Sequence, residues 1–347
     1  MDDTIDMRAG EELDLERLEP YLREQLPETR GVFDVRQFGG GHANLTYLVR
    51  FGETEYVLRR PPPGPLPKGG HDMAREYRVL SKLWRSFALA PRAFVLCMDH
   101  EILGADFVVM ERRRGIVIRR ALPAAIAGDP AAAKALGENF IDTLANLHRV
   151  DVDAFADLGR PHGYLERQLD GWVMRWEAAA TPDVPDARAL VARLRATRPE
   201  SGPPALVHND FKFENAIVDA NDPTQFVAIL DWDMCTVGDP LADLGNVLSL
   251  WIDPGERPEI ISSTMPTDAP GFPTRAQLVE RYALATGRDC SRSSWYFTFN
   301  VFRYAAISQQ IYARFLRGQT QDPRFAKFGP YVASLIARGR DLAEAGI

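Results

Sequence analysis

Cysteine, histidine and long hydrophobic runs are scarce in this chain of 347 residues. Its three cysteines, Cys97, Cys235 and Cys290, lie far apart and are odd in number, which excludes a cysteine-rich zinc cluster and favours a reducing compartment. The six histidines are spread along the chain, which argues against a two-metal hydrolase. No stretch reaches the roughly 18 consecutive apolar residues of a membrane span, and the acidic N-terminal segment lacks a signal-peptide pattern. We therefore expect a cytoplasmic protein without a membrane partner.

An excess of positive charge is also missing. The formal net charge is −7, and binding a nucleic-acid backbone requires a basic face, so we expect no nucleic-acid partner. The charge is uneven, because residues 301–347 hold seven Lys and Arg but only three Asp and Glu. The apolar fraction of 46% is enough for a sizeable core without disulfides or a structural metal.

Hydrophobic periodicity predicts a sheet region near the start of the chain. An amphipathic helix is predicted first, from the helical spacing of Leu15, Leu18 and Leu22. Alternating residues, a glycine turn and a tight turn then predict an antiparallel sheet over residues 33–60. The next segment, "HDMAREYRVLSKLW", predicts a helix that returns to this sheet. Its predicted buried face holds Met73, Tyr77, Leu80 and Trp84.

Beyond about Gly115 the pattern changes to helices, after a further pair of predicted strands and a polar connector. A switch from strands to helices is typical of an α+β chain, here with a small sheet lobe and a larger helical lobe. The predicted domains are an N-terminal helix region at residues 1–30, a sheet lobe at residues 31–114 and a helical lobe at residues 115–347.

Polar residues gather in two neighbouring segments, "LVHNDFKFENAIVD" from Leu206 and "ILDWDMCTVGDPLADLG" from Ile229. Between them, the apolar runs "AIVD" and "FVAIL" flank "ANDPTQ", whose Asn, Asp and Pro favour a turn and predict a β-hairpin. Antiparallel pairing would bring Asn215 beside Asp231. One amide and one carboxylate oxygen suit Mg²⁺, which keeps several waters and takes further ligands from phosphates. Asp210, at the start of the same loop, is left to act as a base.

These residue types are what phosphoryl transfer demands, namely a carboxylate for the attacking hydroxyl and ligands for Mg²⁺. "HNDFKFEN" has the His-x-Asp-x4-Asn form of the kinase catalytic loop, and "DWD" stands where protein kinases carry Asp-Phe-Gly. The continuation "GDPLADLG" resembles the aminoglycoside phosphotransferase and choline-kinase branch of the kinase-like fold. The stretches "GGGHANLTYLV", "YVLRRPPPG", "HDMAREYRVLSKL" and "LANLHRVD" resemble the same branch in the same order, over roughly residues 30–320. The chain is most similar to the phosphotransferase domains linked to acyl-CoA dehydrogenases.

The resemblance implies a bilobal protein-kinase-like fold and a role for each matching residue. Asp210 would be the catalytic base, and Asn215 and Asp231 would hold Mg²⁺. A cation at the end of "YVLRR", which strand alternation assigns to Arg59, would bind the phosphates of ATP and pair with Glu76. The family usually has Lys at this place, and the planar fork of Arg does not reproduce the point charge of Lys.

Other implied nucleotide contacts lie in two turns. Backbone N–H groups of "GGGHAN" would cover the phosphates, although such glycine turns are also common in ordinary hairpins. The implied contact residues are Gly39, Gly40, Gly41, His42 and Asn44. The polar connector at Glu111 and Arg112 would contact adenine through its backbone.

Two residues of the polar cluster stay open between a chemical and a structural role. His208 fits a base or a ligand, but in this type of loop it more often braces the backbone. Asp233 fits a second metal-site carboxylate or a loop cap. Capping of the following helix is a sufficient explanation for Asp239. Arg at position 59 also leaves open a catalytically silent, kinase-like binding module as the alternative to an ATP- and Mg²⁺-dependent kinase.

The expected partner is a small molecule with a hydroxyl group. Aminoglycosides are polycations that favour an acidic pocket, whereas the C-terminal segment is basic, and choline would need aromatic rings with nearby acids. Basic residues near apolar ones better suit an anionic or hydroxyacyl-type alcohol. The candidate substrate contacts are Arg303, Arg314, Trp172 and Trp295. The two tryptophan rings equally fit a helical core, and the choice between ATP and GTP and the oligomeric state stay open.

Overall fold

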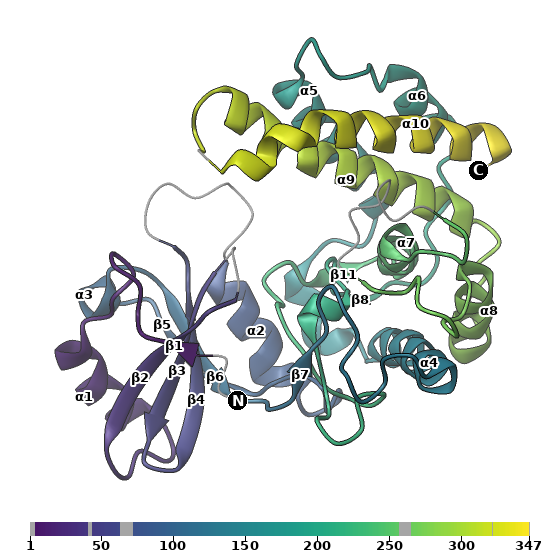
Figure 1. Ribbon diagram of the computed structural model, residues 1–347. Coiled ribbons are helices and arrows are strands. Elements are labelled where there is room, and N and C mark those ends of the chain that lie inside the picture. Colours follow the sequence, from purple (N-terminus) through teal and green to yellow (C-terminus); the bar gives the residue numbers. More distant parts are fainter. Residues whose placement is uncertain (1–3, 41–43, 63–71, 257–264, 321, 347) are drawn as a thin grey trace. The chain divides into compact units, whose positions relative to one another are not determined.

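The computed structural model describes residues 4–40, 44–62, 72–256, 265–320 and 322–346. The chain forms two compact units (Figure 1). The first unit consists of residues 1–116, 215–220 and 226–235, and the second of residues 117–214, 221–225 and 236–347. The chain therefore crosses between the units five times. The predicted domain limits after residues 30 and 114 stay predictions.

The first unit is built on a six-stranded sheet with the strand order β1-β2-β3-β4-β6-β5. Its neighbouring strands are antiparallel, which confirms the sheet predicted over residues 33–60. The strands are β1 (Thr4–Ile5), β2 (Phe33–Phe38), β3 (Leu45–Phe51), β4 (Thr54–Arg60), β5 (Ala93–Cys97) and β6 (Phe107–Glu111). The helices are α1 (Leu15–Gln25), α2 (Met73–Leu83) and α3 (His100–Leu103).

One face of this sheet carries a hydrophobic core. Tyr47 and Phe51 of β3 join Leu18 and Leu22 of α1 in one buried cluster, so α1 is the amphipathic helix that its leucine spacing predicts. Alternate residues of a strand point to opposite faces of the sheet. Leu58 of β4 belongs to the same cluster, so the next residue, Arg59, points to the other face of the sheet. Helix α2 packs against β5 and β6.

The buried face of α2 differs from the predicted one. Its buried residues are Met73, Glu76, Val79, Leu80 and Leu83. Tyr77 and Trp84 are only partly buried, so their prediction as core residues was wrong. The cause is Glu76, a charged residue that lies on the buried face because its carboxylate pairs with Arg59 of β4. Trp84 instead lies between two guanidinium groups at the surface.

The second unit is mainly helical, as predicted. Its helices are α4 (Pro130–Leu147), α5 (Tyr164–Ala179), α6 (Arg188–Ala196), α7 (Leu241–Leu250), α8 (Arg275–Thr286), α9 (Ser293–Leu316) and α10 (Phe328–Gly346). All residues of α7 are buried, and α9 and α10 lie side by side (Figure 1). A Cβ on Gly245 of α7 would lie 2.5 Å from the carbonyl oxygen of Tyr296 in α9, so this close contact requires glycine.

Short strands frame the polar cluster that the sequence singled out. β8 (Ala205–Val207) pairs with β11 (Thr236–Gly238) in the second unit. β9 (Ala216–Val218) and β10 (Phe226–Ile229) form the antiparallel hairpin that was predicted, and β7 (Ile116–Val117) continues its sheet.

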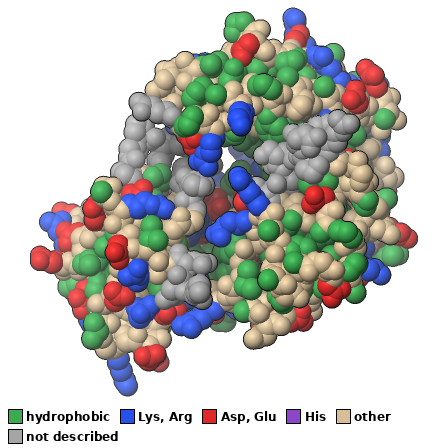
Figure 2. Space-filling model, viewed as in Figure 1, with side chains coloured by type: hydrophobic (Ala, Val, Ile, Leu, Met, Phe, Trp, Pro, Cys, Tyr) green, Lys and Arg blue, Asp and Glu red, His purple; other side chains and the backbone are tan. Residues whose placement is uncertain are grey.

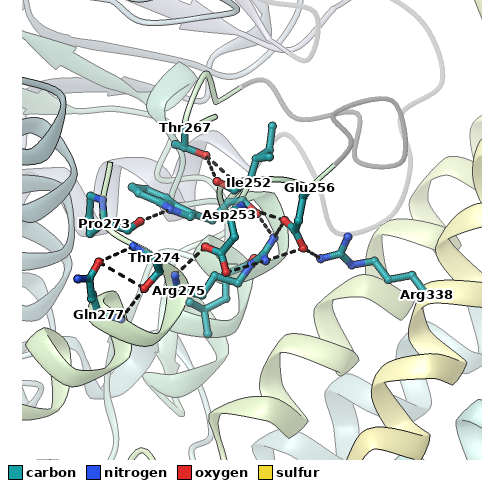
Figure 3. Close-up of polar contacts among 11 residues, drawn as sticks. Ile252, Asp253, Glu256, Thr267, Pro273, Thr274, Arg275, Gln277 and Arg338 are labelled. Carbon is teal, nitrogen blue, oxygen red and sulfur yellow. Dashed lines mark hydrogen bonds and ion pairs between the residues drawn. The ribbon is translucent and has the colours of Figure 1, made fainter. Parts of the chain in front are cut away.

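A charged cluster connects the segment after α7 to α8 and α10 (Figure 3). Arg275 donates to both carboxylate oxygens of Glu256, at 2.8 and 2.7 Å, and Arg338 donates to the same carboxylate at 2.8 Å. The backbone N–H of Asp253 adds a bond of 2.9 Å. Burial alone would raise the pKa of Glu256, but these donors and charges lower it to about 2. Both guanidinium groups also lie over the ring of Phe297 in α9.

Charged side chains of both signs are spread among hydrophobic ones on the face seen in Figure 2. The formal net charge of −7 is therefore not gathered in one acidic patch there. Among the helices that the structure describes, none combines the length and the apolar character needed to cross a membrane.

Candidate active site

The loop after β8 carries His208, Asn209 and Asp210, and a buried aspartate of α7 fixes it. Asp243 accepts the backbone N–H groups of His208 at 2.6 Å and of Asn209 at 2.7 Å. Asn209 has φ +69°, a left-handed conformation that Asn adopts more readily than most residues. The ring of His208 is buried, and its Nδ1 accepts the N–H of Asp210 at 3.3 Å. This is the contact expected of a residue that braces the loop.

A second buried group supports Asp243 from α4. His148 Nε2 lies 3.3 Å from the Asp243 carboxylate, and its Nδ1 lies 2.7 Å from the hydroxyl of Tyr282 in α8. Burial lowers the pKa of His148, so the ring is neutral at pH 7. Burial alone would raise the pKa of Asp243, but its bonds to His148 and to the loop lower it and keep the carboxylate ionised. The sequence alone gave Asp243 no role.

Lys212 is a further loop residue that sequence reasoning missed. Its Nζ lies 2.9 Å from Oδ2 of Asp210, the predicted base. Burial alone would lower the pKa of Lys212, but the charge of Asp210 raises it, so the amine stays protonated. Its place two residues after Asp210 in "HNDFKFEN" was the available signal. The carboxylate therefore has a cation beside it.

The hairpin places Asn215 and Asp231 at its open end. Ala216 pairs with Ile229, and the N–H of Leu230 donates to the carbonyl oxygen of Asn215 at 2.7 Å. Asp231 follows with φ +68°. Asn215 therefore lies opposite Leu230, the residue before Asp231, and the role of the two residues as metal ligands stays a prediction.

Arg59 and Glu76 meet in the first unit, next to Asp231. The Arg59 guanidinium bonds to Glu76 through one nitrogen and to Asp231 Oδ1 through the other, the latter at 2.7 Å. Asp233, the neighbouring carboxylate, accepts from the side-chain amide of Asn44 at 3.2 Å. Glu76 is fully buried and Arg59 is 9% exposed.

The charged groups of this cluster change one another's pKa. Burial, helped by the charges of Asp231 and Asp233, raises the pKa of Glu76 to about 7 against the attraction of Arg59. Burial alone would lower the pKa of Arg59, but the same three carboxylates raise it. Arg59 thus bonds to two carboxylates and lies in the field of a third.

This donor set fits a hard divalent cation. The amide oxygen of Asn215 and the carboxylate oxygens of Asp231 are ligands that Mg²⁺ accepts. No group of three or more His, Cys, Asp and Glu suited to a metal occurs in the described ranges. Mg²⁺ held here would therefore take its remaining ligands from waters and phosphates.

The glycine turn is described only in part. Gly39 and Gly40 are exposed, Asn44 is buried, and Gly41 and His42 lie outside the described residues. Gly39 and Gly40 follow β2, and Asn44 precedes β3.

The connector after β6 contacts neighbouring residues of the first unit. Glu111 donates its N–H to the carbonyl oxygen of Arg92 at 2.8 Å, and its carboxylate accepts the N–H of Arg92 at 3.1 Å. The guanidinium of Arg112 lies 4.8 Å from the ring centre of Phe38, the last residue of β2. These contacts fix the connector's backbone.

The four predicted substrate residues have different surroundings. Arg303 is 7% exposed and donates to the carbonyl oxygen of Asn209 at 2.6 Å, and its guanidinium lies 5.4 Å from the ring centre of Trp172. Within the described part of the chain no carboxylate forms an ion pair with it. Arg314 is exposed on α9. Trp295 has no exposed surface and donates to a backbone carbonyl of α6, so it lies in the helical core.

The sequence matches the phosphotransferase enzyme family over residues 34–274, well over half of the chain. The chain belongs to this family. This match confirms the family resemblance that the sequence motifs indicated, and with it the phosphotransferase class.

Curated relatives point to the same branch. The chain is 30% identical over 326 residues to acyl-CoA dehydrogenase family member 11 of Rattus norvegicus, covering 91% of this chain and 41% of that protein. It spans 41 to 45% of the length of the five family member 11 proteins that it matches. The likeness to a phosphotransferase linked to acyl-CoA dehydrogenases is therefore confirmed.

Solved structures confirm the α+β kinase-like fold. A Ralstonia eutropha structure assigned as an aminoglycoside phosphotransferase has a TM-score of 0.82 at 27% identity, with 96% of this chain and 99% of that chain covered. Aminoglycoside phosphotransferase APH(4)-Ia, solved with AMP-PNP and hygromycin B, has a TM-score of 0.59 at 17% identity, with 95% and 98% covered. At this lower identity the second match supports the fold alone.

Proposed function

We propose that the protein is an ATP- and Mg²⁺-dependent kinase that phosphorylates a hydroxyl group of a small molecule. The observation that carries the proposal is the hairpin end, where Asn215 accepts the N–H of Leu230, Asp231 follows Leu230 in the chain, and Arg59 binds Asp231 at 2.7 Å. Oxygen ligands beside a fixed cation are what a Mg²⁺-bound triphosphate needs. Membership of the phosphotransferase enzyme family supports the same class of reaction.

In this proposal the first unit binds the nucleotide. Asn215 and Asp231 hold Mg²⁺, with Asp233 as a further carboxylate near the site, and Arg59 contacts the phosphates while Glu76 fixes its guanidinium. Mg²⁺ offsets the negative charge that develops on the phosphate oxygens. The glycine turn and the connector at Glu111 and Arg112 supply backbone contacts to the phosphates and to adenine.

The second unit supplies the base. Asp210 takes the proton of the acceptor hydroxyl as its oxygen attacks the γ-phosphorus, while the bond from that phosphorus to the bridging oxygen breaks and ADP leaves. Lys212, which stays protonated, holds the Asp210 carboxylate at 2.9 Å. Asp243 fixes the backbone before Asp210 through two N–H bonds. The base is thus held in place before the acceptor binds.

We further propose an anionic or hydroxyacyl-type alcohol as the acceptor. Arg303 is a buried cation whose hydrogen bonds go to neutral acceptors on Asn209, Asn246 and Asn300, and it forms no ion pair with a carboxylate of the described ranges. Its field favours an anionic group near the loop of Asp210 and disfavours a polycation. The apolar face of Trp172 beside it suits an acyl chain. Relatives named for acyl-CoA dehydrogenases agree with this class.

A second candidate is a catalytically silent nucleotide-binding module. The supporting observation is that Arg59, which stands where the family usually has Lys, already binds two carboxylates. A guanidinium that remained on both of them would not reach a phosphate. This alternative predicts nucleotide binding without transfer.

Calorimetric titration of Mg-ATP into wild type, Asp231→Ala and Asp210→Ala tests the kinase proposal. We expect binding by wild type that requires Mg²⁺, binding within about threefold of wild type for Asp210→Ala, and at least a tenfold loss for Asp231→Ala, because a charged metal ligand is removed. Equal losses in both variants would contradict the separate roles.

A transfer assay then separates the two candidates. The acceptor panel contains hydroxyacyl thioesters, free hydroxy acids and hygromycin B, with Asp210→Ala as the inactive control. Phosphorylation of the first two classes supports the full proposal, and phosphorylation of hygromycin B alone would overturn the acceptor class. Tight Mg-ATP binding without transfer to any acceptor would favour the silent module.

A further inference from the structure

The segment before α1 lies along the edge of the six-stranded sheet and reaches the glycine turn. β1 pairs with the end of β2, with Ile5 opposite Gln37. Three residues later, the Arg8 guanidinium donates to the carbonyl oxygen of Gly39 at 2.8 Å. Gly39 opens the turn "GGGHAN", which we assign to the nucleotide phosphates. An arginine outside the family match therefore touches the first residue of this turn.

Arg8 is itself anchored by a buried polar side chain. The backbone N–H of Arg8 donates to Oε1 of Gln37 at 2.8 Å, and Nε2 of Gln37 donates to the carboxylate of Glu11 at 2.5 Å. Gln37 is 1% exposed, so both ends of its buried amide are satisfied by the segment that carries Arg8. Glu11 also accepts from the Arg8 guanidinium at 3.4 Å, and its carbonyl oxygen accepts the hydroxyl of Tyr47 at 2.5 Å. The position of Arg8 is thus set by β2 and β3, the strands on either side of the turn.

The bond to Gly39 also determines where an N–H group points. The C=O and N–H of a planar trans peptide point in opposite directions, so holding the Gly39 carbonyl toward Arg8 directs the Gly40 N–H away from it. A peptide between two glycines otherwise rotates easily, because neither residue has a Cβ to restrict φ and ψ. Arg8 removes this freedom before any ligand binds.

We propose that Arg8 is a positioning residue that fixes the Gly39–Gly40 peptide so that the Gly40 N–H is presented to a nucleotide phosphate. The inference rests on the proposed function of the glycine turn. An N–H group that is already oriented costs less ordering on binding, and backbone N–H groups in a turn bind anions well. Arg8 acts through the peptide and needs no phosphate contact of its own.

Titration of Mg-ATP into wild type, Arg8→Ala, Arg8→Lys and Arg36→Ala tests this role. Arg36 is the matched control, because it bonds to Thr4 and Asp6 on the same sheet edge and makes no contact with Gly39. We expect Arg8→Ala to weaken Mg-ATP binding by about three- to tenfold, the range for one lost hydrogen bond. Arg8→Lys, which keeps a charged donor, should recover part of the loss, and Arg36→Ala should match wild type.

Adenosine, measured by competition against a fluorescent Mg-ATP analogue, separates positioning from general damage to the sheet. Because adenosine has no phosphate, its affinity should be the same in wild type and Arg8→Ala. Equal weakening of adenosine and Mg-ATP, or equal effects of Arg36→Ala and Arg8→Ala, would overturn the role. If wild type binds Mg-ATP and Arg8→Ala binds it with the same affinity, this inference alone is overturned. Wild type that fails to bind Mg-ATP would overturn the proposed function, and this inference with it.

Discussion

At the scale of single residues, Arg59 is the cation of a charged cluster in the first unit. Its guanidinium bonds to Glu76 and Asp231 and lies in the field of Asp233, and Glu76 is fully buried. Removing one partner of a buried ion pair leaves the other charge without compensation, which costs far more than the loss of an exposed pair. Arg59 therefore has a structural role that does not depend on nucleotide.

Arg59→Met should lower the free energy of unfolding by about 3 to 5 kcal/mol, because Glu76 loses its cation and must either stay an uncompensated buried charge or take up a proton well above its ordinary pKa. Urea unfolding at pH 7.5 measures this. Adding Glu76→Gln should recover at least half of the loss, since a neutral amide needs no counter-charge. Arg36→Met, which breaks a pair with the exposed Asp6, should change stability by at most about 1 kcal/mol. If Arg59→Met lowered the free energy of unfolding no more than Arg36→Met does, Arg59 and Glu76 would not be coupled.

At the scale of elements, local sequence patterns predicted helices and strands well, whereas contacts between residues distant in the sequence were not predicted. The hairpin was predictable because its two runs and its turn are contiguous, and its register places Asn215 opposite Leu230, one residue before Asp231. The buried face of α2 was mistaken because a charged residue, Glu76, occupies it.

Two further features needed the tertiary structure. Helix α10 is continuous although Gly-Pro stands near its start and Gly339 lies in its interior, and Gly339 is where Leu190 of α6 packs closely. Asp243 binds the loop of Asp210 across 35 positions of sequence, and His148 contacts Asp243 across 95 positions, which no single-sequence pattern reveals.

The cluster around Glu256 should give the helical unit a pH-dependent stability. Its folded pKa of about 2 lies below the ordinary value of 4.5, so its contribution is complete above the ordinary value and is lost as pH falls toward 2. Glu256→Gln should cost about 2 kcal/mol at neutral pH, because donors from Arg275 and Arg338 lose a charged acceptor.

Urea midpoints of wild type and Glu256→Gln, measured from about pH 7 to pH 3, test the sign of this effect. The difference should be constant down to about pH 5 and shrink below it. Glu344→Gln, at an exposed position near the end of α10, is the matched control and should follow wild type at every pH. A difference that grew on acidification would contradict the argument.

At the scale of the whole molecule, the two units are interleaved along the chain. The chain crosses between them five times, and residues 215–220 and 226–235 of the first unit are connected on each side to segments of the second. Asp231, which binds Arg59, lies in one of these inserted segments. Unfolding of the second unit would therefore release both ends of the hairpin that completes the first. We expect the two units to unfold in one cooperative transition.

The three cysteines provide local probes for this expectation. Cys97 and Cys235 are buried in the first unit, and Cys290 is buried in the second. Thiol labelling across a urea series, quantified for each cysteine by mass spectrometry, should give three curves with the same midpoint, because each thiol reacts only when its surroundings open. Arg59→Met, although it acts in the first unit, should move all three midpoints together. If Cys97 and Cys235 were labelled at a lower urea concentration than Cys290, the first unit would open alone. The five chain crossings between the units would then not couple their unfolding.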